Sequence, residues 1–400
     1  MLLLERAFPP DIRVEKEART LLKVGHEVFL LSLRKEDLSD EEVVDGIKVI
    51  RHQLPRKRPL PIRAWNYFRL QLFFIHPLWT RVVEDTIKKY QIEALHVHDL
   101  PSVTVGLNVA RKFNLPLVAD LHENYPEDVR VSPMTWKGNL VKPITIKLWK
   151  QTEKYCVRQA NRIITVVDEA KEHYVHDYGV SPQKVTVVMN AEDLDYFCSL
   201  PVKEEIVSKY QPYVTIAYIG GFGHHRGIQT TISAMPKIML EIPRSKLLLV
   251  GSGNNEDELR QLARKEGVEE AVEFVGWQPF TLVPSYIAAS QVCLVPHIAS
   301  GFTDTTVPHK IFQYMAMGKP VITSSAKPLA RIIKETGAGI VYPSGDAATL
   351  AETVIRIYQD EELAARLRQA AKIAVTTKYN WQREEEKLIT LYQELGRDTK

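Results

Sequence analysis

Short β-branched runs alternate with amphipathic stretches along the whole chain. Runs typical of buried strands lie at 26–31, 92–97, 117–121, 162–167 and 184–188, and again at 214–219, 245–250, 272–275, 292–295, 321–323 and 339–341. Between them, apolar positions recur at helical spacing, for example in 13–24, 255–266 and 347–358. The alternation predicts parallel sheets covered by helices on both faces.

This rhythm is interrupted between residues 190 and 210, where Asp193, Asp195 and Pro201 precede a charged stretch. A chain of 400 residues favours two domains, at roughly 100–200 residues each. We predict two Rossmann-like, doubly wound α/β domains at 1–195 and 196–380, and a last helix, 381–400, that returns to the first domain. We interpret the Asp-Leu-Asp at 193–195 as a solvated loop.

The composition also predicts the cellular compartment of the protein. The three cysteines, Cys156, Cys198 and Cys293, lie far apart without metal-ligand spacing, which predicts buried thiols in a reducing environment and neither a disulfide framework nor a zinc site. The first residues lack a basic stretch before an apolar run, so we expect no signal peptide. No segment has the roughly 20 apolar residues of a membrane span. We expect a cytoplasmic protein, soluble or peripheral on the inner face of the cell membrane.

A glycine-rich turn, Tyr218-Ile-Gly-Gly-Phe-Gly-His-His-Arg-Gly227, follows one predicted strand and precedes a helix. Glycine lets backbone approach a ligand closely, and the N–H groups of a helix start attract anions. Arg226 adds a forked donor suited to phosphate. These features predict a diphosphate cradle formed by Gly221, Phe222, Gly223, Arg226 and Gly227; an ordinary tight turn is the alternative.

A second segment, 304–322, predicts a helix over 308–317 followed by a strand. Thr305 and Thr306 lie just before the helix start, where an anion can be held. Lys310 lies in the first turn, an unfavourable place for a cation unless it meets a phosphate. Gln313, near the same face, is a candidate for a ribose hydroxyl.

A third segment, Gly276-Trp277-Gln-Pro, follows another predicted strand and offers backbone groups for a base edge. Packing of Trp277 in the core is the alternative.

These motifs, taken in order, make the chain resemble a retaining glycosyltransferase of family 4 with the GT-B fold. The matching segments extend along nearly all of the chain; they are 8–18, 25–28, 96–101, 120–127, Asn190, 220–227, 251–253, 276–277 and 308–322. The resemblance implies a cleft between an acceptor-side first domain and a second domain that binds a nucleotide-diphosphate sugar, UDP- or GDP-linked. It also implies transfer without a metal ion or other cofactor.

The resemblance also suggests site residues. His122 corresponds to the catalytic histidine that contacts the donor sugar, Arg226 to the basic group on the diphosphate, and Gln313 to the ribose-contacting position. On the acceptor side it suggests Arg13, Asp99 and Glu123, with no metal ligand.

Three departures from the family pattern stand out. The usual pair of glutamates is replaced by Thr305 and Gln313, and the usual basic residue of the glycine-rich turn by Gly221. The first loop lacks its glycines, which leaves Arg13 or backbone groups to serve there.

Two basic segments bear on the acceptor. Residues 51–90 contain nine Lys/Arg and two Asp/Glu, and residues 131–158 contain six and one, although the formal net charge of the chain is only +3. Basic residues among aromatic ones suit an anionic membrane surface, which we place at 55–80 and 136–158. We expect a glycan or lipid-linked acceptor, as in polysaccharide or glycoconjugate biosynthesis, and no nucleic acid.

Two other functions stay open. A nucleotide-sugar epimerase on the same scaffold would use groups such as His122 and Glu123. A non-catalytic subunit that only binds the donor would fit the missing glutamate pair.

Overall fold

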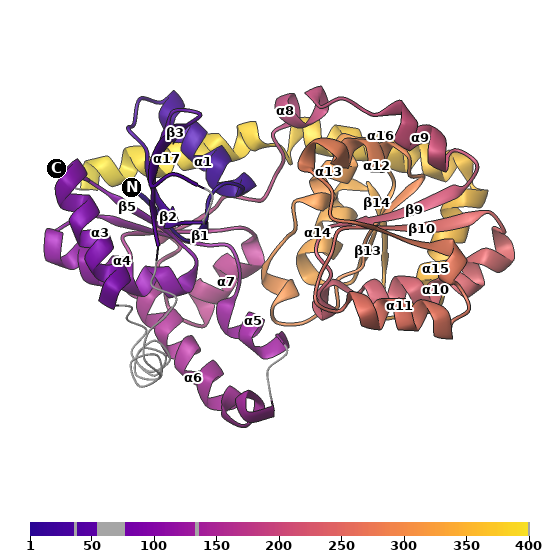
Figure 1. Cartoon of the computed structure of the whole chain (residues 1–400), viewed down its shortest axis with the longest axis horizontal. Coiled ribbons are helices and arrows are strands. Elements are labelled where there is room, and N and C mark those ends of the chain that lie inside the picture. The colour runs from indigo at the N-terminus through magenta and orange to yellow at the C-terminus, as the bar shows by residue number, and fades with distance from the viewer. Residues whose placement is uncertain (36–37, 54–76, 133–135, 399–400) are drawn as a thin grey trace. The chain divides into compact units, whose positions relative to one another are not determined.

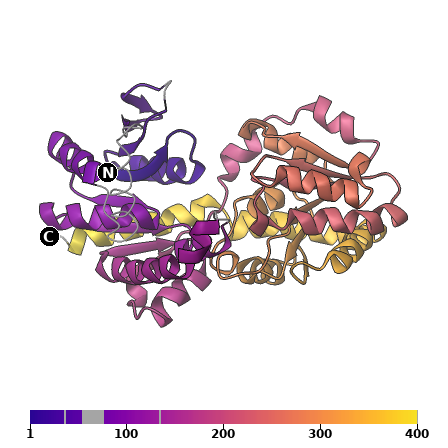
Figure 2. The ribbon, with the colours of Figure 1, turned by 60° about the horizontal axis from the view of Figure 1, so that its bottom comes forward.

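The computed structural model describes residues 1–35, 38–53, 77–132 and 136–398. The chain forms two compact units: unit 1 is Met1–Met189 with Glu384–Lys400, and unit 2 is Asn190–Arg383. The divisions predicted from the sequence lie nearby, after residues 195 and 380. Each unit is an α/β layer structure of its own (Figures 1 and 2).

Unit 1 contains a sheet with strand order β3-β4-β2-β1-β5-β6-β7-β8. Its strands are β1 (Leu2–Ala7), β2 (Phe29–Leu33), β3 (Glu41–Val44), β4 (Ile47–His52), β5 (Leu95–His98), β6 (Leu117–Leu121), β7 (Arg162–Thr165) and β8 (Val185–Val187). All neighbours pair in parallel except β3 and β4. Every residue of β5 and β6 is buried, because helices cover both faces of a parallel sheet.

The helices of unit 1 follow the strands in a β/α alternation. They are α1 (Ile12–Lys23), α3 (Pro77–Tyr90), α4 (Leu100–Phe113), α5 (Tyr125–Val131), α6 (Trp136–Gln159), α7 (Asp168–His176) and α17 (Trp381–Asp398). From Glu384 onward α17 belongs to unit 1, where Glu385 pairs with Lys23 and Tyr392 bonds to His96. The last helix thus packs on the first sheet.

Unit 2 contains a parallel sheet with strand order β11-β10-β9-β12-β13-β14. Its strands are β9 (Val214–Ile219), β10 (Ser245–Val250), β11 (Val272–Gly276), β12 (Val292–Val295), β13 (Val321–Ser324) and β14 (Gly339–Tyr342). Its helices are α8 (Leu194–Ser199), α9 (Glu204–Tyr210), α10 (Ile228–Glu241), α11 (Glu256–Lys265), α12 (Val283–Ala288), α13 (Lys310–Ala316), α14 (Lys327–Thr336), α15 (Ala347–Gln359) and α16 (Glu361–Thr377). In Figure 1, the strands lie between α10, α11 and α15 on one side and α12, α13 and α16 on the other.

Several local predictions differ from the structure. The predicted helix 308–317 is shorter, since α13 begins at Lys310. Asp193 and Asp195 do not form a solvated loop: Asp193 caps the N-terminus of α8, and Asp195 accepts a hydrogen bond from Gln382. Cys156 and Cys293 are buried as expected, but Cys198 is exposed.

Both sheets reverse their strand order at one point, between β1 and β5 in unit 1 and between β9 and β12 in unit 2. In open α/β sheets, ligands bind at the carboxyl ends of the strands beside such a reversal. These two edges are where the candidate site residues lie.

Candidate active site

His122 lies at the carboxyl edge of the first sheet, immediately after β6. Its Nε2 is 2.6 Å from Oδ2 of Asp120, the buried fourth residue of that strand, and its Nδ1 is 3.6 Å from Oδ1 of Asp99. The His122 side chain keeps 16% of its surface exposed. One ring nitrogen is therefore fixed by the sheet, while the other faces the edge where a ligand can approach.

Arg13, predicted on the acceptor side, lies buried behind Asp120. It is 3% exposed and binds both Asp120 oxygens, with Nε 3.2 Å from Oδ2 and Nη2 2.9 Å from Oδ1. It also pairs with Glu17 and donates to the carbonyl oxygen of Val188. A buried guanidinium needs hydrogen-bond partners for its N–H groups, and the protein supplies them here. Arg13 therefore has no N–H group left to bind an acceptor sugar.

The charges of this cluster favour a protonated His122. Burial opposes ionisation of Asp120, but Arg13 and His122 outweigh it and hold the pKa of Asp120 well below its ordinary value. Burial likewise opposes the His122 imidazolium, but the Asp120 carboxylate outweighs it and raises the pKa of His122. His122 can then donate a hydrogen bond through Nδ1 to an oxygen at the sheet edge.

Four buried groups next to His122, namely Glu17, His96, His98 and Asp120, have ligand-type atoms within 4.8 Å of one another. The guanidinium of Arg13 already takes both Asp120 oxygens, and a divalent cation would have to displace it. Burial raises the pKa of Glu17 to about 8 and lowers the pKa of His96 to about 4, so both side chains are mainly uncharged at neutral pH. This set therefore fits a hydrogen-bonded cluster better than a metal site.

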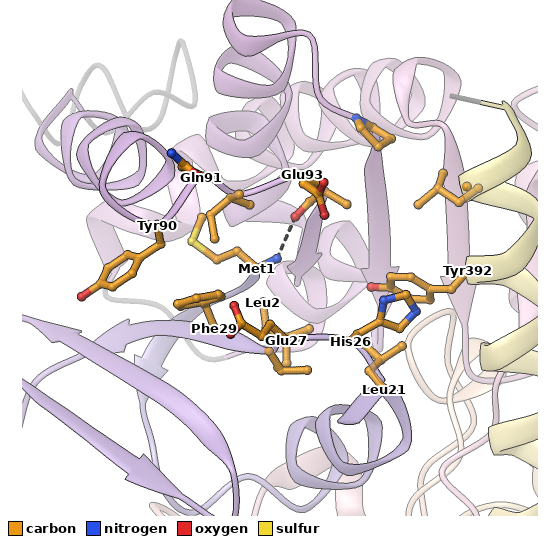
Figure 3. Close-up of a pocket in the computed structure, with 16 residues that line it drawn as sticks. Met1, Leu2, Leu21, His26, Glu27, Phe29, Tyr90, Gln91, Glu93 and Tyr392 are labelled. Carbon is orange, nitrogen blue, oxygen red and sulfur yellow. Dashed lines mark hydrogen bonds between the residues drawn. The ribbon is translucent and has the colours of Figure 1, made fainter. Parts of the chain in front are cut away.

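A cavity of about 430 Å³ lies at the other edge of the same sheet, where β1, β2, β5 and β6 begin. Figure 3 shows the rings of His26 and Tyr392 next to each other in it, and Met1, whose amino group donates to the carbonyl oxygen of Ala94. Because it opens at the amino ends of the strands, this cavity is separate from the edge that carries His122.

A second cavity, of about 340 Å³, lies at the carboxyl edge itself. Asp99 and Glu123, both predicted on the acceptor side, line it together with Tyr125, Trp149 and Arg6. Arg6, which the sequence analysis missed, pairs with Asp99 at 3.1 Å; its place at the end of the first strand was the available signal. The cavity offers carboxylates and aromatic rings, a combination that suits sugar hydroxyls and ring faces.

In unit 2, the glycine-rich turn serves packing more than ligand approach. A Cβ on Gly227 would lie 1.8 Å from the carbonyl oxygen of Pro296, and one on Gly220 would lie 2.5 Å from Lys310 Nζ. Phe222, predicted at the donor site, is 3% exposed and packs on Phe274 in the core. Its side chain is therefore not available to a ligand, because the turn folds inward there.

The other two glycines predicted in this turn have more room. A Cβ on Gly221 would have one neighbour within 4 Å, the carbonyl oxygen of Ser252 at 3.9 Å, whereas one on Gly223 would meet the His225 ring at 3.0 Å. Gly221 is thus the open position of the turn.

Basic side chains gather where β9 and β12 end. Arg226 Nη1 is 3.3 Å from His297 Nε2, the His225 ring lies 6.5 Å from the His297 ring, and Lys310 Nζ lies 3.6 Å above the Tyr218 ring. No carboxylate pairs with Arg226, His225, His297 or Lys310 among the residues described. We call these four residues the basic cluster. Sequence reasoning had singled out Arg226 and Lys310 but not the histidines, although His225 belongs to the glycine-rich turn.

Burial and the neighbouring positive charges lower the pKa values of three members of the basic cluster, His225, His297 and Lys310. Burial, followed by the charges of Arg226 and Lys310, lowers the pKa of His225 to about 4 and holds the pKa of His297 well below its ordinary value. Burial and Arg226 also hold the pKa of Lys310 well below its ordinary value. A group of buried and half-buried bases without acids among the described residues is a place where an anion would be stabilised.

The remaining predicted donor residues differ in burial and in hydrogen bonding. Gln313 is 6% exposed, and its amide donates to Glu192 Oε2 at 2.8 Å, a partner 121 residues away that the sequence did not suggest. Thr305 donates to the carbonyl oxygen of Gly301, and Thr306 follows it in extended conformation. Gly276 has φ 81°, and Trp277 after it is 69% exposed, which excludes the core position considered for it.

Comparison with known proteins identifies the family. Residues 12–196 match the family described as Glycosyltransferase Family 4, and residues 202–374 match the one described as Glycosyl transferases group 1. The chain belongs to glycosyltransferase family 4. Family 4 is thus matched in unit 1, which carries His122, and group 1 in unit 2, which carries the basic cluster.

Relatives of this family-4 chain match over nearly its whole length. An uncharacterized glycosyltransferase of Methanocaldococcus jannaschii is 26% identical over 383 residues, covering 94% of this chain and 92% of the relative. A glycogen synthase of Mycobacterium tuberculosis is 22% identical, covering 96% and 91%. A phosphatidyl-myo-inositol mannosyltransferase of Mycolicibacterium smegmatis is 23% identical, covering 94% and 87%.

Solved structures show the same fold. Sucrose-phosphate synthase from Thermosynechococcus elongatus has a TM-score of 0.80 at 20% identity and 99% coverage of both chains. The Anabaena protein HepE in complex with UDP-glucose has a TM-score of 0.73 at 16% identity, with coverage of 98% and 99%. The predicted GT-B fold is confirmed. Among the residues described, no helix has the length and apolar character needed to cross a membrane.

Proposed function

We propose that this family-4 protein is a retaining glycosyltransferase that moves a hexose or N-acetylhexosamine from a UDP- or GDP-sugar to a glycan or lipid-linked acceptor. The observation that carries the proposal is the basic cluster of unit 2. It lies at the strand-order reversal of a parallel sheet and lacks carboxylate partners among the described residues. A diphosphate supplies the negative charge that this cluster lacks.

The leaving diphosphate gains negative charge as the bond to the sugar breaks. Arg226 and Lys310 stabilise that charge, together with the N-terminus of α10, which Gly227 caps with its backbone alone. These groups take the place of a bound metal ion, so we propose a reaction that needs neither a metal nor another cofactor.

His122 is the proposed catalytic residue of unit 1. With Nε2 held by Asp120, it presents Nδ1–H to the donor sugar, where it donates a hydrogen bond to a sugar oxygen and orients the sugar for loss of the diphosphate. The hydrogen bond from Nε2 fixes the ring orientation, which keeps the donor N–H in place before the substrate binds.

The cavity that contains Asp99 and Glu123 is the proposed acceptor pocket. Its carboxylates accept hydrogen bonds from sugar hydroxyls, and the edge-to-face pair of Tyr125 and Trp149 offers an apolar wall. Three carboxylates, with Asp128 as the third, face one arginine, Arg6, in this pocket. An uncharged sugar fits this balance better than a phosphate group does.

A membrane role remains a proposal for the basic segments. The segment 55–76 lies outside the described residues. In α6, Trp149 is 3% exposed and Lys150 pairs with Glu127, so neither is free for a membrane. Val141 and Ile144 are 50% and 63% exposed on the same helix and are the apolar residues that could enter a lipid surface.

The test is nucleotide binding followed by transfer. We expect UDP or GDP, added without metal at about 100 times the dissociation constant, to stabilise the wild type by roughly 2.7 kcal/mol in a thermal-shift measurement. Arg226→Ala should lose this shift, whereas Arg260→Ala, which removes an exposed arginine paired with Glu256 on α11, should keep it. No shift with any nucleotide would refute donor binding; a shift without transfer to sugar acceptors would leave a binding subunit.

A further inference from the structure

Arg13 forms the buried base of the His122 site. It comes from the second residue of α1, whereas Asp120 belongs to β6 and Val188 follows β8, so one guanidinium joins three distant segments. Its two contacts with Asp120 use adjacent N–H groups and approach both carboxylate oxygens. Such forked pairing fixes the plane of the carboxylate and not only its distance.

The plane of the Asp120 carboxylate decides where His122 points. Asp120 Oδ2 is 3.2 Å from Arg13 Nε and 2.6 Å from His122 Nε2, so both residues share one oxygen. Rotation of this carboxylate would break either the Arg13 pair or the His122 hydrogen bond. The histidine ring is consequently held by a carboxylate that cannot turn.

Glu17 contacts the same guanidinium nitrogen, Nη2, that binds Asp120 Oδ1. Its Oε1 is 2.9 Å from Arg13 Nη2, one turn further along α1, and its side chain is fully buried. Because burial raises the pKa of Glu17 to about 8, the carboxyl group is mostly protonated at neutral pH and leaves most of the Arg13 charge to Asp120. A second full negative charge here would instead compete with Asp120 for the guanidinium.

We propose that Arg13 is a positioning residue for His122: through its fork on Asp120 it fixes the plane of the carboxylate and so sets the direction of the imidazole. The inference rests on the proposed role of His122 in transfer. A positive charge next to the Asp120–His122 pair weakens the pull of the carboxylate on the imidazolium. Arg13 thereby limits how far the Asp120 carboxylate raises the pKa of His122.

Other titratable and charged groups face His122 and enter the same balance. They are Asp99 at the end of β5, His96 and His98 within it, Glu17 on α1 and, through His96, Tyr392 on α17. Asp99 is the partly exposed one of these and binds Arg6 as well. Arg13 differs from all of them because it is the permanent cation in contact with Asp120.

The experiment compares Arg13→Lys with a matched control, Arg51→Lys. Arg51 is also a buried arginine of unit 1, 2% exposed, that donates to the carbonyl oxygens of Phe8 and Ser39 and pairs with Glu42. Both changes remove a buried fork, but Arg51 makes no contact with Asp120. The ring nitrogens of His122, assigned by their loss in His122→Gln, are followed by NMR during a pH titration of the nucleotide-free protein.

We expect the pKa of His122 to rise by about half a unit or more in Arg13→Lys and to stay unchanged in Arg51→Lys, because a lysine cannot neutralise both oxygens of Asp120. Transfer should lose about tenfold or more in kcat in Arg13→Lys, with little change in KM for the donor. A folded Arg13→Lys protein with an unchanged His122 titration would overturn the proposal.

If Arg13→Lys does not fold, a pH titration of the wild type still tests whether Arg13 and His122 are coupled. The Nε–H signal of Arg13 should then change with the same midpoint as His122, and an unchanging signal would refute the coupling. Both titrations use the nucleotide-free protein, so they can succeed or fail whether or not the proposed sugar transfer is found.

Discussion

Replacing Lys310 with methionine should make the nucleotide-free protein more stable while it destroys nucleotide binding. Lys310 is 8% exposed, and its ammonium meets the Tyr218 ring but no carboxylate among the described residues. The ring contact contributes about 0.5–2 kcal/mol. Burial of an unpaired ammonium costs several kcal/mol, so an apolar side chain of similar length should stabilise unit 2 by about 1–3 kcal/mol.

The effect on binding has the opposite sign. A unit charge about 4 Å from a phosphate oxygen, at an effective dielectric constant of about 20, contributes about 4 kcal/mol. Since about 1.4 kcal/mol corresponds to a tenfold change in Kd, Lys310→Met should weaken UDP or GDP binding by up to about a thousandfold. The nucleotide-free melting temperature should rise by about 2–4 °C for each kcal/mol gained.

Lys319→Met is the control, because Lys319 is a second largely buried lysine of unit 2 whose partners are known. Its Nζ donates to the carbonyl oxygens of Ala288 and Ser290 at 2.9 and 2.6 Å. Loss of these bonds should destabilise the protein by about 1–3 kcal/mol and leave nucleotide affinity unchanged. Calorimetric melting and titration with UDP and GDP measure both quantities. A Lys310→Met protein that melts lower than the wild type and still binds nucleotide would refute the reasoning.

The pH dependence of stability gives a second test of the burial of Lys310. The pKa of Lys310 is lower in the folded protein than in the unfolded chain, where it is near the ordinary 10.5. Between these two values the unfolded chain binds the extra proton, so the stability of the wild type should increase with pH there. Lys310→Met should lose this part of the pH dependence.

Three further predictions follow from the same cluster. UDP binding should take up protons onto the bases whose pKa values are lowered, among them His225 and His297, so its affinity should fall as the pH rises and its heat should differ between PIPES and Tris buffers; equal heats would contradict this. Gly221→Arg should leave the free energy of unfolding nearly unchanged and tighten UDP binding. Gly227→Ala, with φ 71° and the Pro296 carbonyl oxygen in the way, should cost roughly 2–4 kcal/mol of stability. Equal melting temperatures of the two variants would contradict the confinement of the turn at Gly227. Transfer should survive EDTA, and activity that returns only on addition of a divalent cation would contradict the metal-free proposal.

Local pattern was sufficient for the bounds of four buried strands, one in unit 1 and three in unit 2. The segments 117–121, 214–219, 245–250 and 292–295 were predicted with the bounds that the structure gives, since continuous apolar runs between turns identify buried parallel strands. The edge hairpin of β3 and β4 was missed. The Asp45-Gly46 dipeptide, a preferred hairpin turn, was the signal available in the sequence; the structure confirms the turn with φ of 49° and 84° and alternating burial along Ile47–His52.

Long-range pairing limited what could be predicted of the site. Arg13 and Asp120 are 107 residues apart, and Gln313 and Glu192 are 121 apart. Nothing in the spacing of either pair indicates that its members meet, because contacts of this kind arise only when the strands take their order in the sheet. Arg13 was accordingly predicted on the acceptor side, and Gln313 as a contact to the donor ribose.

The His122 site of unit 1 and the basic cluster of unit 2 therefore differ in how well their charges are balanced without a ligand. At the His122 site of unit 1 the described charges are opposed in pairs: Arg13 by Asp120, and Asp120 by His122. In unit 2 the described bases Arg226 and Lys310 repel each other and lack an acid. Electrostatics thus predicts a preformed catalytic histidine and a donor site whose charge balance is completed by the diphosphate itself. Substitutions in unit 1 should then act mainly on kcat, and those in unit 2 mainly on donor affinity.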